Sequence, residues 1–438
     1  MTHIAIIGAG ITGVTTAYAL ARRGYSVTVV DRQRYAAMET SFANGGQLSA
    51  CNAEVWNKLS TVLHGIQWMM RRDAPLLMNP TPSWHKLSWM AEFMREIAHY
   101  RQNTVETVRL ALKARTALFA MAEAEGIDFD LKTRGILHFY RDRASFEKAH
   151  AVNALLREGG LERYAVTPEE IRAIEPTLAG TYAGGYFTPS DATGDIHKFT
   201  RGLAAACARK GVRFVHDASV ETIAAGEGGY AIGWRQAGHL ADRPAADAQV
   251  LHADAQVLHA DAQVLHADAV VICAGCASRR FAAMLGDRVN VYPVKGYSIT
   301  VNLLTPQAQK AAPEVSILDE AAKIVTSRLG DERLRVAGTA EFNGFNRDIR
   351  HDRVQPLIDW TREQFPLVDT DRVVAWSGLR PMLPNMLPKV GRGRRKGVFY
   401  NTGHGHLGWT LSGATAELVA EAVAAEHAPE AVGLDLAA

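Results

Sequence analysis

The sequence has few cysteines and no long uninterrupted hydrophobic run. Its four cysteines, Cys51, Cys207, Cys273 and Cys276, are too few to form a disulfide framework in a chain of 438 residues. No window of 18 uninterrupted apolar residues occurs, so the sequence predicts no membrane-spanning helix. It opens on a strand-like run without the basic segment and apolar stretch of a signal peptide. We therefore expect a cytoplasmic protein, or one bound peripherally to the inner face of the cell membrane.

A strong charge of either sign is also absent. The formal net charge is +2 and no run of five Lys or Arg appears, so nothing in the composition indicates a nucleic-acid partner. The chain is 47% hydrophobic and 21% charged, as in ordinary globular proteins with small-molecule ligands. Its length suggests two domains, with three as the alternative.

Cys273 and Cys276 have the spacing of a redox pair. They follow the apolar run 269–272 at a predicted strand end, where Gly275 supplies the turn. No second cysteine pair or His-x-x-His lies nearby to complete a zinc site. We interpret both cysteines as packing and turn residues, with redox chemistry as the alternative, and we expect no metal site.

The first 31 residues have the pattern of a dinucleotide-binding unit. A buried-strand run at His3–Ile7 precedes a glycine turn, a helix predicted over Val14–Arg23 and a second strand over Tyr25–Val30. In this order the helix N-terminus faces a pyrophosphate and an acidic residue at the second strand end accepts hydrogen bonds from a ribose. The predicted contacts are Gly8, Ala9, Gly10, Ile11, Thr12, Gly13, Asp31 and Arg32.

Residues 55–100 are rich in tryptophan and methionine. This segment holds Trp56, Trp68, Trp84 and Trp89, half of the tryptophans, together with basic residues. Its helical spacing continues to about residue 125. One interpretation is core packing and a lid over a pocket. The other is peripheral membrane contact through residues 56–95, because Trp beside Arg suits a membrane interface.

Residues 246–266 are three identical copies of the seven-residue unit Ala-Asp-Ala-Gln-Val-Leu-His. Three copies with one Val-Leu pair each are too few and too polar for a coiled coil. We interpret the repeat as a surface loop before a strand, since such loops tolerate duplication. His252, His259 and His266 suggest a metal site as the alternative, which loss of nickel or zinc binding on their replacement by Ala would support.

Four further blocks resemble the FAD-dependent D-amino acid dehydrogenases. They are Glu39–Ser49 (ETSFANGGQLS), Tyr292–Ser298 (YPVKGYS), Trp376–Met382 (WSGLRPM) and Asn401–Thr410 (NTGHGHLGWT). With the glycine turn they occur in the family's order and span essentially the whole chain. The broader group includes glycine oxidase, sarcosine oxidase and D-amino acid oxidase.

The resemblance implies an α/β fold with a FAD-binding, Rossmann-like domain of the glutathione-reductase type. That domain is expected to be discontinuous, with a mainly antiparallel α+β substrate domain inserted between its segments. We expect residues 1–85, 195–285 and 375–438 to form the FAD-binding domain, and residues 86–194 and 286–374 to form the substrate domain.

The resemblance also assigns further cofactor contacts. Ser41, Asn44, Gly45, Gly46 and Gln47 form a small polar turn near the pyrophosphate and the flavin ring. The glycines of 403–408 open a C-terminal helix whose N-terminus supports negative charge on the reduced flavin. The remaining expected contacts are Val220, Ala274, Gly275, Gly403, Gly405, His406, Leu407, Gly408, Trp409 and Thr410. A covalent flavin link through Cys51 is an alternative to a noncovalent cofactor.

Arg380 is the residue that the resemblance assigns to the substrate carboxylate. A planar guanidinium offers that anion two parallel donors, which Lys does not; a structural ion pair is the alternative. Tyr297 is expected to donate a second hydrogen bond and His404 to line the pocket, with structural roles as alternatives. After Arg380 the family reads Thr-Pro-Asp-Gly-x-Pro, whereas this chain has Leu-Pro-Asn-Met-Leu-Pro over 383–388.

We predict oxidative deamination of a D-amino acid, or of a cyclic one such as a D-proline derivative, by hydride transfer to flavin N5. No second glycine-rich nucleotide site is visible, so the resemblance implies a respiratory quinone or a redox protein as electron acceptor. Two alternatives stay open: an oxidase that uses O₂, and a flavoprotein subunit of a larger dehydrogenase.

Overall fold

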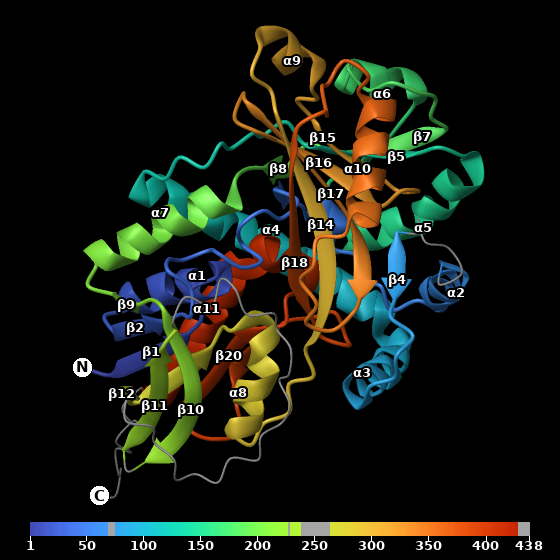
Figure 1. The fold of residues 1–438 in the computed structure, drawn as a ribbon. Coiled ribbons are helices and arrows are strands. Elements are labelled where there is room, and N and C mark those ends of the chain that lie inside the picture. Colours follow the sequence, from blue (N-terminus) through green and yellow to red (C-terminus); the bar gives the residue numbers. More distant parts are fainter. Residues whose placement is uncertain (69–74, 227, 238–262, 428–438) are drawn as a thin grey trace, which may run out of the picture.

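The structure is a computed structural model that describes residues 1–68, 75–226, 228–237 and 263–427. Two larger sheets dominate this part of the chain. In Figure 1 a six-stranded sheet lies at the lower left, near the N-terminus, and a nine-stranded sheet stands above it and to the right.

The six-stranded sheet has the order β19-β20-β13-β1-β2-β9. All neighbouring strands are parallel except the edge strand β19, which is antiparallel to β20. Its central strands are short runs of Val, Ile and Ala that are buried on both faces, as parallel strands usually are. The bounds are β1 His3–Ile7, β2 Ser26–Val30, β9 Arg213–Val215, β13 Ala269–Ile272, β19 Lys389–Arg392 and β20 Val398–Thr402.

Alternate residues of this sheet face two different layers. Ile4 and Ile6 pack in a core with helices α1, α7, α11 and α4, whereas Ala5 and Ile7 pack in a second core with β10, β11 and α8. The sheet is thus the middle of three layers. The helices are α1 Ile11–Ala21, α4 Tyr100–Glu125, α7 Ile196–Arg209, α8 Ser278–Met284 and α11 Gly408–His427, and the three-stranded sheet consists of β10 Ala218–Gly226, β11 Gly229–Gln236 and β12 Gln263–Ala267.

The last residues of the seven-residue repeat at 246–266 form a strand. Gln263 to His266, the last residues of the third copy, lie in β12 and pair antiparallel with β11, so the loop interpretation is wrong for these residues. Pairing satisfies their backbone groups, and the strand ends at the buried Ala267. Residues 246–262, with His252 and His259, lie outside the described residues. Within the described part, no group of three or more His, Cys, Asp or Glu is arranged to hold a metal ion.

The nine-stranded sheet is mainly antiparallel and has the order β18-β14-β17-β16-β15-β5-β7-β6, with β4 beside β17. One face is covered by α10, whose Leu357 and Trp360 share a core with Ile299 and Val336 of the sheet. β18 pairs with β14 along its length, although the predicted boundary at residue 375 assigns most of β18 to the FAD-binding domain. The bounds are β4 Leu76–Met78, β5 Ile136–Tyr140, β6 Tyr164–Val166, β7 Gly184–Thr188, β14 Tyr292–Asn302, β15 Ser316–Asp319, β16 Ile324–Leu329, β17 Arg333–Phe342, β18 Val373–Met382 and α10 His351–Gln364.

The tryptophan-rich segment forms two helices at one edge of the molecule, α2 Leu59–Trp68 and α3 Trp84–Arg95. Trp89 is buried in a core with Phe93 and Tyr292, whereas Trp84 is 80% exposed. Ser83 caps the N-terminus of α3, because its side chain accepts a hydrogen bond from the Lys86 N–H. Within the described ranges, no helix has both the length and the apolar character that a membrane crossing requires. Shorter elements are β3 Gln47–Leu48, β8 Ala192–Thr193, α5 Arg143–Glu158, α6 Pro168–Ile174 and α9 Pro306–Ala311.

Candidate functional site

A cavity of about 850 Å³ lies between the two sheets. One wall is formed by the turns after β1, β2, β13 and β20, at the carboxyl edge of the parallel sheet, which is where α/β folds of this kind bind ligands. The opposite wall is the face of β14, β16, β17 and β18 that α10 does not cover. The fold therefore brings the separate sequence blocks to one cavity.

The glycine turn has the geometry of a phosphate cradle. Gly8 has φ +109°, and a Cβ there would lie 2.6 Å from the Cys273 carbonyl oxygen. A Cβ on Gly13 would lie 1.9 Å from the Gly8 carbonyl oxygen, which allows helix and strand to pack closely. Helix α1 starts after Gly10, which provides no side-chain cap, and has no acidic residue in its first turn. The Ile11 N–H donates to the Ser41 hydroxyl at 3.1 Å, and the positive end of the helix still favours an anion. Gly8, Gly10, Ile11 and Thr12 line the cavity; Ala9 and Gly13 lie behind them.

Asp31 lies at the end of β2 and lines the same wall. Its carboxylate accepts hydrogen bonds from the N–H groups of Ala9 (2.6 Å) and Gln33 (2.8 Å). Burial raises the pKa of Asp31, and these two N–H groups oppose the shift. Arg32 also lines the cavity, but its guanidinium is bonded to Glu39 at 2.5 Å. The charge of Arg32 is therefore already paired within the chain.

The predicted flavin turn, residues 41–47, and the C-terminal loop, residues 403–410, both border the cavity. Ser41, Asn44, Gly45, Gly46 and Gln47 all line the cavity, as do Val220, Ala274, Gly275, Gly403, Gly405, His406, Gly408 and Trp409. Leu407 instead packs in a core with Leu411. Thr410 also does not line the cavity, and its hydroxyl accepts a hydrogen bond from the Ser49 N–H at 3.2 Å.

These walls fit FAD. The cradle glycines leave room for a pyrophosphate, and the first turn of α1 presents N–H groups after that of Ile11, which is bonded to Ser41. The indole Nε1 of Trp409 is buried at the cavity wall and has no hydrogen-bond partner among the described residues. Buried donors are normally paired, so a partner other than the described residues, such as a bound cofactor, is expected.

Arg380 lies on β18 with its guanidinium against Gly296 of β14. A Cβ on Gly296 would lie 2.4 Å from Nη2 and 2.8 Å from Nη1 of Arg380, so only glycine leaves space for this side chain. Nη1 donates a hydrogen bond to the Thr339 carbonyl oxygen at 2.9 Å. Among the described residues no carboxylate forms an ion pair with Arg380, and burial lowers its pKa to about 10. It therefore stays charged at neutral pH without an acidic partner.

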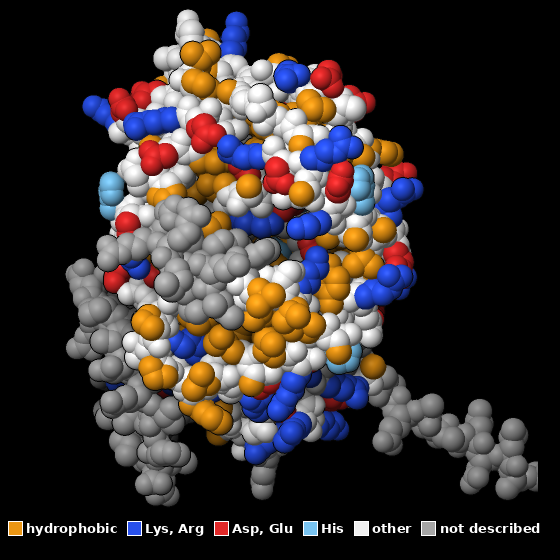
Figure 2. Space-filling view, turned by 90° about the vertical axis from the view of Figure 1, so that its right-hand side faces the viewer, with side chains coloured by type: hydrophobic (Ala, Val, Ile, Leu, Met, Phe, Trp, Pro, Cys, Tyr) orange, Lys and Arg blue, Asp and Glu red, His pale blue; other side chains and the backbone are white. Residues whose placement is uncertain are grey.

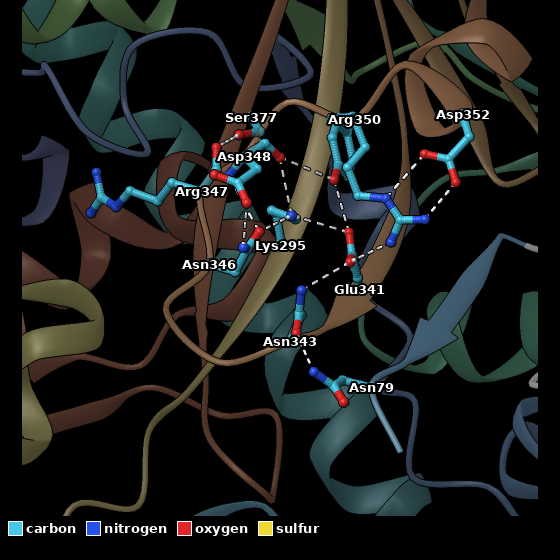
Figure 3. Close-up of polar contacts among 11 residues, drawn as sticks. Asn79, Lys295, Glu341, Asn343, Asn346, Arg347, Asp348, Arg350, Asp352 and Ser377 are labelled. Atoms are coloured by element: carbon cyan, nitrogen blue, oxygen red, sulfur yellow. Dashed lines mark hydrogen bonds and ion pairs between the residues drawn. The ribbon is translucent and has the colours of Figure 1, made fainter. Parts of the chain in front are cut away.

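Tyr297 does not lie beside Arg380 as expected. Arg380 pairs with Val294 and lies over Gly296, so the side chain of Tyr297 projects from the other face of β14. There it is 1% exposed, and its hydroxyl donates to Glu341 at 2.8 Å. Lys295 pairs with the same carboxylate at 3.2 Å, and Figure 3 shows Lys295, Glu341 and Arg350 converging. Tyr297 is among the residues that line the cavity, but its hydroxyl is engaged by Glu341; this geometry does not favour the expected hydrogen bond to the substrate, which stays a prediction.

The two histidines of the C-terminal loop have different environments. His404 lines the cavity, but its Nε2 lies 3.0 Å from the Thr415 hydroxyl and burial lowers its pKa to about 3. His406 stacks on Trp56 at 5.0 Å, and its Nε2–H donates to the Asn52 carbonyl oxygen at 3.2 Å. Burial lowers the pKa of His406 to about 4, and the charge of Arg380 adds to the shift. Both rings are neutral at pH 7, and a catalytic role for His404 stays a prediction.

Three cavity-lining residues form a chain that the sequence did not indicate. His138 on β5 lies 3.0 Å from the Cys51 Sγ through Nε2 and 2.8 Å from Glu320 through Nδ1. Burial raises the pKa of Cys51, and the carboxylate of Asp191 adds to the shift. A neutral, buried thiol argues against a covalent flavin link through Cys51. The three residues come from distant segments, and a lone histidine in a buried strand was the only available signal.

The turn after Arg380 keeps a left-handed residue despite its altered sequence. Met386 stands where the family has glycine and adopts φ +64°. Its N–H donates to the Leu383 carbonyl oxygen at 3.0 Å. The Asn385 side chain accepts from the Leu387 N–H at 3.2 Å, as the family's Asp could. Met386 therefore differs from the family's glycine in its buried side chain and not in its backbone conformation.

Comparison with known proteins agrees with this geometry. Residues 3–422 match the family DAO, described as "FAD dependent oxidoreductase". D-amino acid dehydrogenase 3 of Mesorhizobium japonicum is 60% identical over 97% of this chain and 98% of its own length. D-amino acid dehydrogenase of Paramagnetospirillum magneticum is 40% identical over 99% of this chain and 97% of its own length.

Solved structures share the fold. Glycine oxidase from Geobacillus kaustophilus superposes with a TM-score of 0.71 at 21% identity, covering 97% of this chain and 95% of that one. L-proline dehydrogenase from P. horikoshii superposes with a TM-score of 0.70 at 15% identity, covering 96% and 92%. These similarities establish the two-sheet architecture.

Proposed function

The chain belongs to the DAO family of FAD-dependent oxidoreductases, and from this premise we propose that it is a dehydrogenase of D-amino acids. The name of the 60% identical relative supports the D configuration. The observation that carries the proposal is Arg380, a half-buried guanidinium without an acidic partner in the described residues, in the same cavity as the glycine cradle. A carboxylate is the ligand that such a group requires.

Arg380 fixes the substrate through its carboxylate. Gly296 lets the guanidinium lie flat against the sheet, and the Thr339 carbonyl oxygen holds Nη1. The other N–H groups can then bind two carboxylate oxygens at once. When bound, FAD supplies the acceptor for the Cα hydride. Orientation by the chain is the main contribution to rate, because a fixed geometry replaces a bimolecular encounter.

The cavity wall favours a neutral substrate amine. Arg380 is cationic, and burial disfavours a second positive charge, as the lowered pKa of His406 illustrates. Hydride loss from Cα requires the amine lone pair, so a neutral amine is the reactive form. The imine product is then hydrolysed by water to a 2-oxo acid and ammonia. A cyclic substrate such as a D-proline derivative would give a cyclic imine instead.

The electron acceptor that we propose is a respiratory quinone or a redox protein. The family resemblance supports this, and the two glycine-rich turns that link strands of the parallel sheet to α1 and α11, at 8–13 and 403–408, border the same cavity. An O₂-using oxidase would form peroxide in stoichiometric amounts during turnover. A subunit of a larger dehydrogenase would have little activity when purified alone.

Peripheral membrane contact through 56–95 is supported by exposed apolar side chains on α2 and α3. These are Leu59, Leu63, Trp84, Leu87 and Met94, each at least 44% exposed. Figure 2 faces this side of the molecule and shows hydrophobic side chains gathered at its centre, with Lys and Arg below them. Apolar side chains beside basic ones suit an anionic lipid surface. Residues 69–74 of this segment lie outside the described residues.

The experiment that tests the proposal is anaerobic bleaching of the flavin absorbance by a panel of substrates. D-amino acids, L-amino acids, prolines and sarcosine are compared at equal concentration. Bleaching by D-amino acids or D-prolines supports the proposal, whereas bleaching by L-amino acids alone contradicts it. A purified protein without flavin absorbance would contradict the cofactor as well.

A further inference from the structure

The predicted flavin turn, residues 41–47, is called the flavin loop from here on. It is attached to the nine-stranded sheet through its carbonyl oxygens. The Ser298 hydroxyl on β14 donates to the Ala43 carbonyl oxygen at 2.8 Å. The Arg335 Nη1 on β17 donates to the Asn44 carbonyl oxygen at 3.1 Å. The Ser327 hydroxyl on β16 donates to the Gly45 carbonyl oxygen at 2.6 Å. Three neighbouring strands thus bind three consecutive carbonyl groups.

The positions of these donors follow from strand register. Ser327 of β16 is directly opposite Arg335 of β17, and Ser298 of β14 is directly opposite Ala337 of β17. Because Arg335 and Ala337 are two residues apart in one strand, their side chains lie on the same face of the sheet. Ala337 lines the cavity, so the donors lie on the cavity face of the sheet. The glycines of the loop permit this close seating, since a Cβ on Gly46 would lie 2.9 Å from the Ser327 Cβ.

Anchoring the carbonyl groups also orients the N–H groups of the loop. In a trans peptide the C=O and the following N–H point in opposite directions. The N–H groups of Asn44 and Gly45, which follow the anchored carbonyls of Ala43 and Asn44, therefore point away from the sheet. Neither has a hydrogen-bond partner among the described residues, and both residues line the cavity. They are donors available to a ligand.

Arg335 adds a buried positive charge beneath the loop. It is 6% exposed, and among the described residues no carboxylate lies within ion-pair distance of it. Its Nε also has no hydrogen-bond partner in the described part of the chain. Burial lowers the pKa of Arg335 to about 10, so it remains a cation at neutral pH. The pKa of Arg335 is also affected by the charge of Asp195, which favours ionisation, and by that of Arg333, which opposes it.

We propose that Ser298, Arg335 and Ser327 are positioning residues that hold the flavin loop by its carbonyl oxygens and so favour the reduced, anionic form of the cofactor. The loop's free N–H groups and the charge of Arg335 both stabilise negative charge. This proposal rests on the FAD-binding function assigned above, but not on the identity of the substrate.

The chain offers a matched control in Arg328 on β16. This residue is also a buried guanidinium bound to backbone carbonyl oxygens, those of Gln309, Ala312, Gly330 and Asp331. It follows Ser327 directly, so its side chain projects from the opposite face of the sheet. Unlike Arg335, Arg328 also has a carboxylate partner, Glu314, at 3.7 Å. Replacing Arg328 removes a buried cation without removing a bond to the loop.

The test is the flavin midpoint potential, measured by spectroelectrochemical titration of the purified holoprotein without any amino acid. Arg335→Gln keeps a donor but removes the charge, Arg335→Lys keeps the charge, and Arg328→Gln is the control. We expect Arg335→Gln to shift the equilibrium towards oxidised flavin at least about tenfold, or ~30 mV for a two-electron couple. Arg335→Lys and Arg328→Gln should stay within about threefold, ~14 mV by the same constant. An unchanged potential in Arg335→Gln, or an equal shift in Arg328→Gln, overturns the electrostatic role.

A second measurement tests the loop anchors even if Arg335→Gln does not fold around flavin. The double variant Ser298→Ala/Ser327→Ala removes two of the three carbonyl bonds with little change in volume. Its dissociation constant for FAD should rise at least about tenfold. An unchanged dissociation constant overturns the anchoring role. Because both readouts are independent of turnover, a wrong substrate assignment does not affect them.

Discussion

The guanidinium of Arg380 lies against the Cα of Gly296, with Nη2 only 2.4 Å from where a Cβ would stand. Nη1 is held at 2.9 Å from the Thr339 carbonyl oxygen, at a residue with φ +60° in an irregular stretch of β17. A cation thus lies flat across a strand and is oriented by a neighbouring strand. Geometry of this kind presents a fixed pair of donors to a planar anion.

Replacing Gly296 by Ala should displace Arg380 and lower kcat/KM about 100-fold, the scale on which a shift of about 1 Å acts on reactivity. The measurement is steady-state kinetics with an artificial electron acceptor. Gly226→Ala is the control, since no atom lies within 4 Å of its Cβ position and its backbone is not in the left-handed region. Equal kinetics in Gly296→Ala and wild type would show that Arg380 does not need its present position.

Removing the Tyr297 hydroxyl should affect stability more than catalysis. The hydroxyl donates to the buried Glu341, so Tyr297→Phe should lower the free energy of unfolding by about 2 kcal/mol. The catalytic efficiency should stay within about threefold, or ~0.6 kcal/mol. Urea unfolding and steady-state kinetics on the same preparation measure both. A large loss of efficiency without loss of stability would return Tyr297 to the substrate site.

Acidification should destabilise the protein through its buried neutral histidines. Burial lowers the pKa of His404 from its usual 6.5 to about 3, so the unfolded chain binds a proton between these values that the native chain does not. The contribution of His404 to the free energy of unfolding is fully present above pH 6.5 and is lost as the pH falls towards 3. At pH 5 the loss amounts to about 2 kcal/mol.

His404→Gln should therefore flatten the decrease in unfolding free energy between pH 7 and pH 5, as measured by urea denaturation. His99→Gln serves as the control, because His99 is exposed and pairs with Glu96 on the helix surface. A pH dependence that is the same in His404→Gln and in wild type would mean that His404 titrates normally in the native state.

Membrane binding should depend on the exposed apolar residues of α2 and α3. The triple variant Leu63→Ser/Trp84→Ser/Leu87→Ser should lower the partition coefficient onto anionic lipid vesicles at least about tenfold, since each side chain contributes ~1 kcal/mol or more on insertion. Vesicle cosedimentation measures this. Leu304→Ser/Leu367→Ser is the control, because both residues are about 80% exposed elsewhere. Failure of the unmodified protein to bind vesicles would contradict the membrane contact.

The sequence predicted most reliably the features whose determinants are local. The glycine turn, the first helix and the strand ending at Val30 follow from residues within one 31-residue segment, and their observed bounds differ by at most three residues. Even there, α1 begins at Ile11 rather than Val14, because Gly13 of the glycine turn is included in its first turn. The loop at Ser41–Gln47 and the glycines of 403–408 reach the same cavity.

Features that depend on long-range register could not be predicted in this way. Whether Tyr297 faces Arg380 is decided by the pairing of Val294 with Arg380 across β14 and β18, which the motif itself does not encode. The chain of Cys51, His138 and Glu320 joins segments 87 and 182 residues apart. No periodic pattern marks such a contact. The three donors that hold the flavin loop are likewise set by the register of β14, β17 and β16.

The measurement that tests the central claim most directly is anaerobic flavin reduction by D- and L-amino acids in wild type and in Arg380→Ala. We predict that D-amino acids bleach the wild-type flavin and that the L-enantiomers do not. Arg380→Ala should retain its flavin but reduce the second-order rate constant at least about 100-fold, or ~3 kcal/mol of transition-state stabilisation. An unchanged rate constant in Arg380→Ala would contradict the assignment of the carboxylate site, and bleaching by L-amino acids alone would contradict the function.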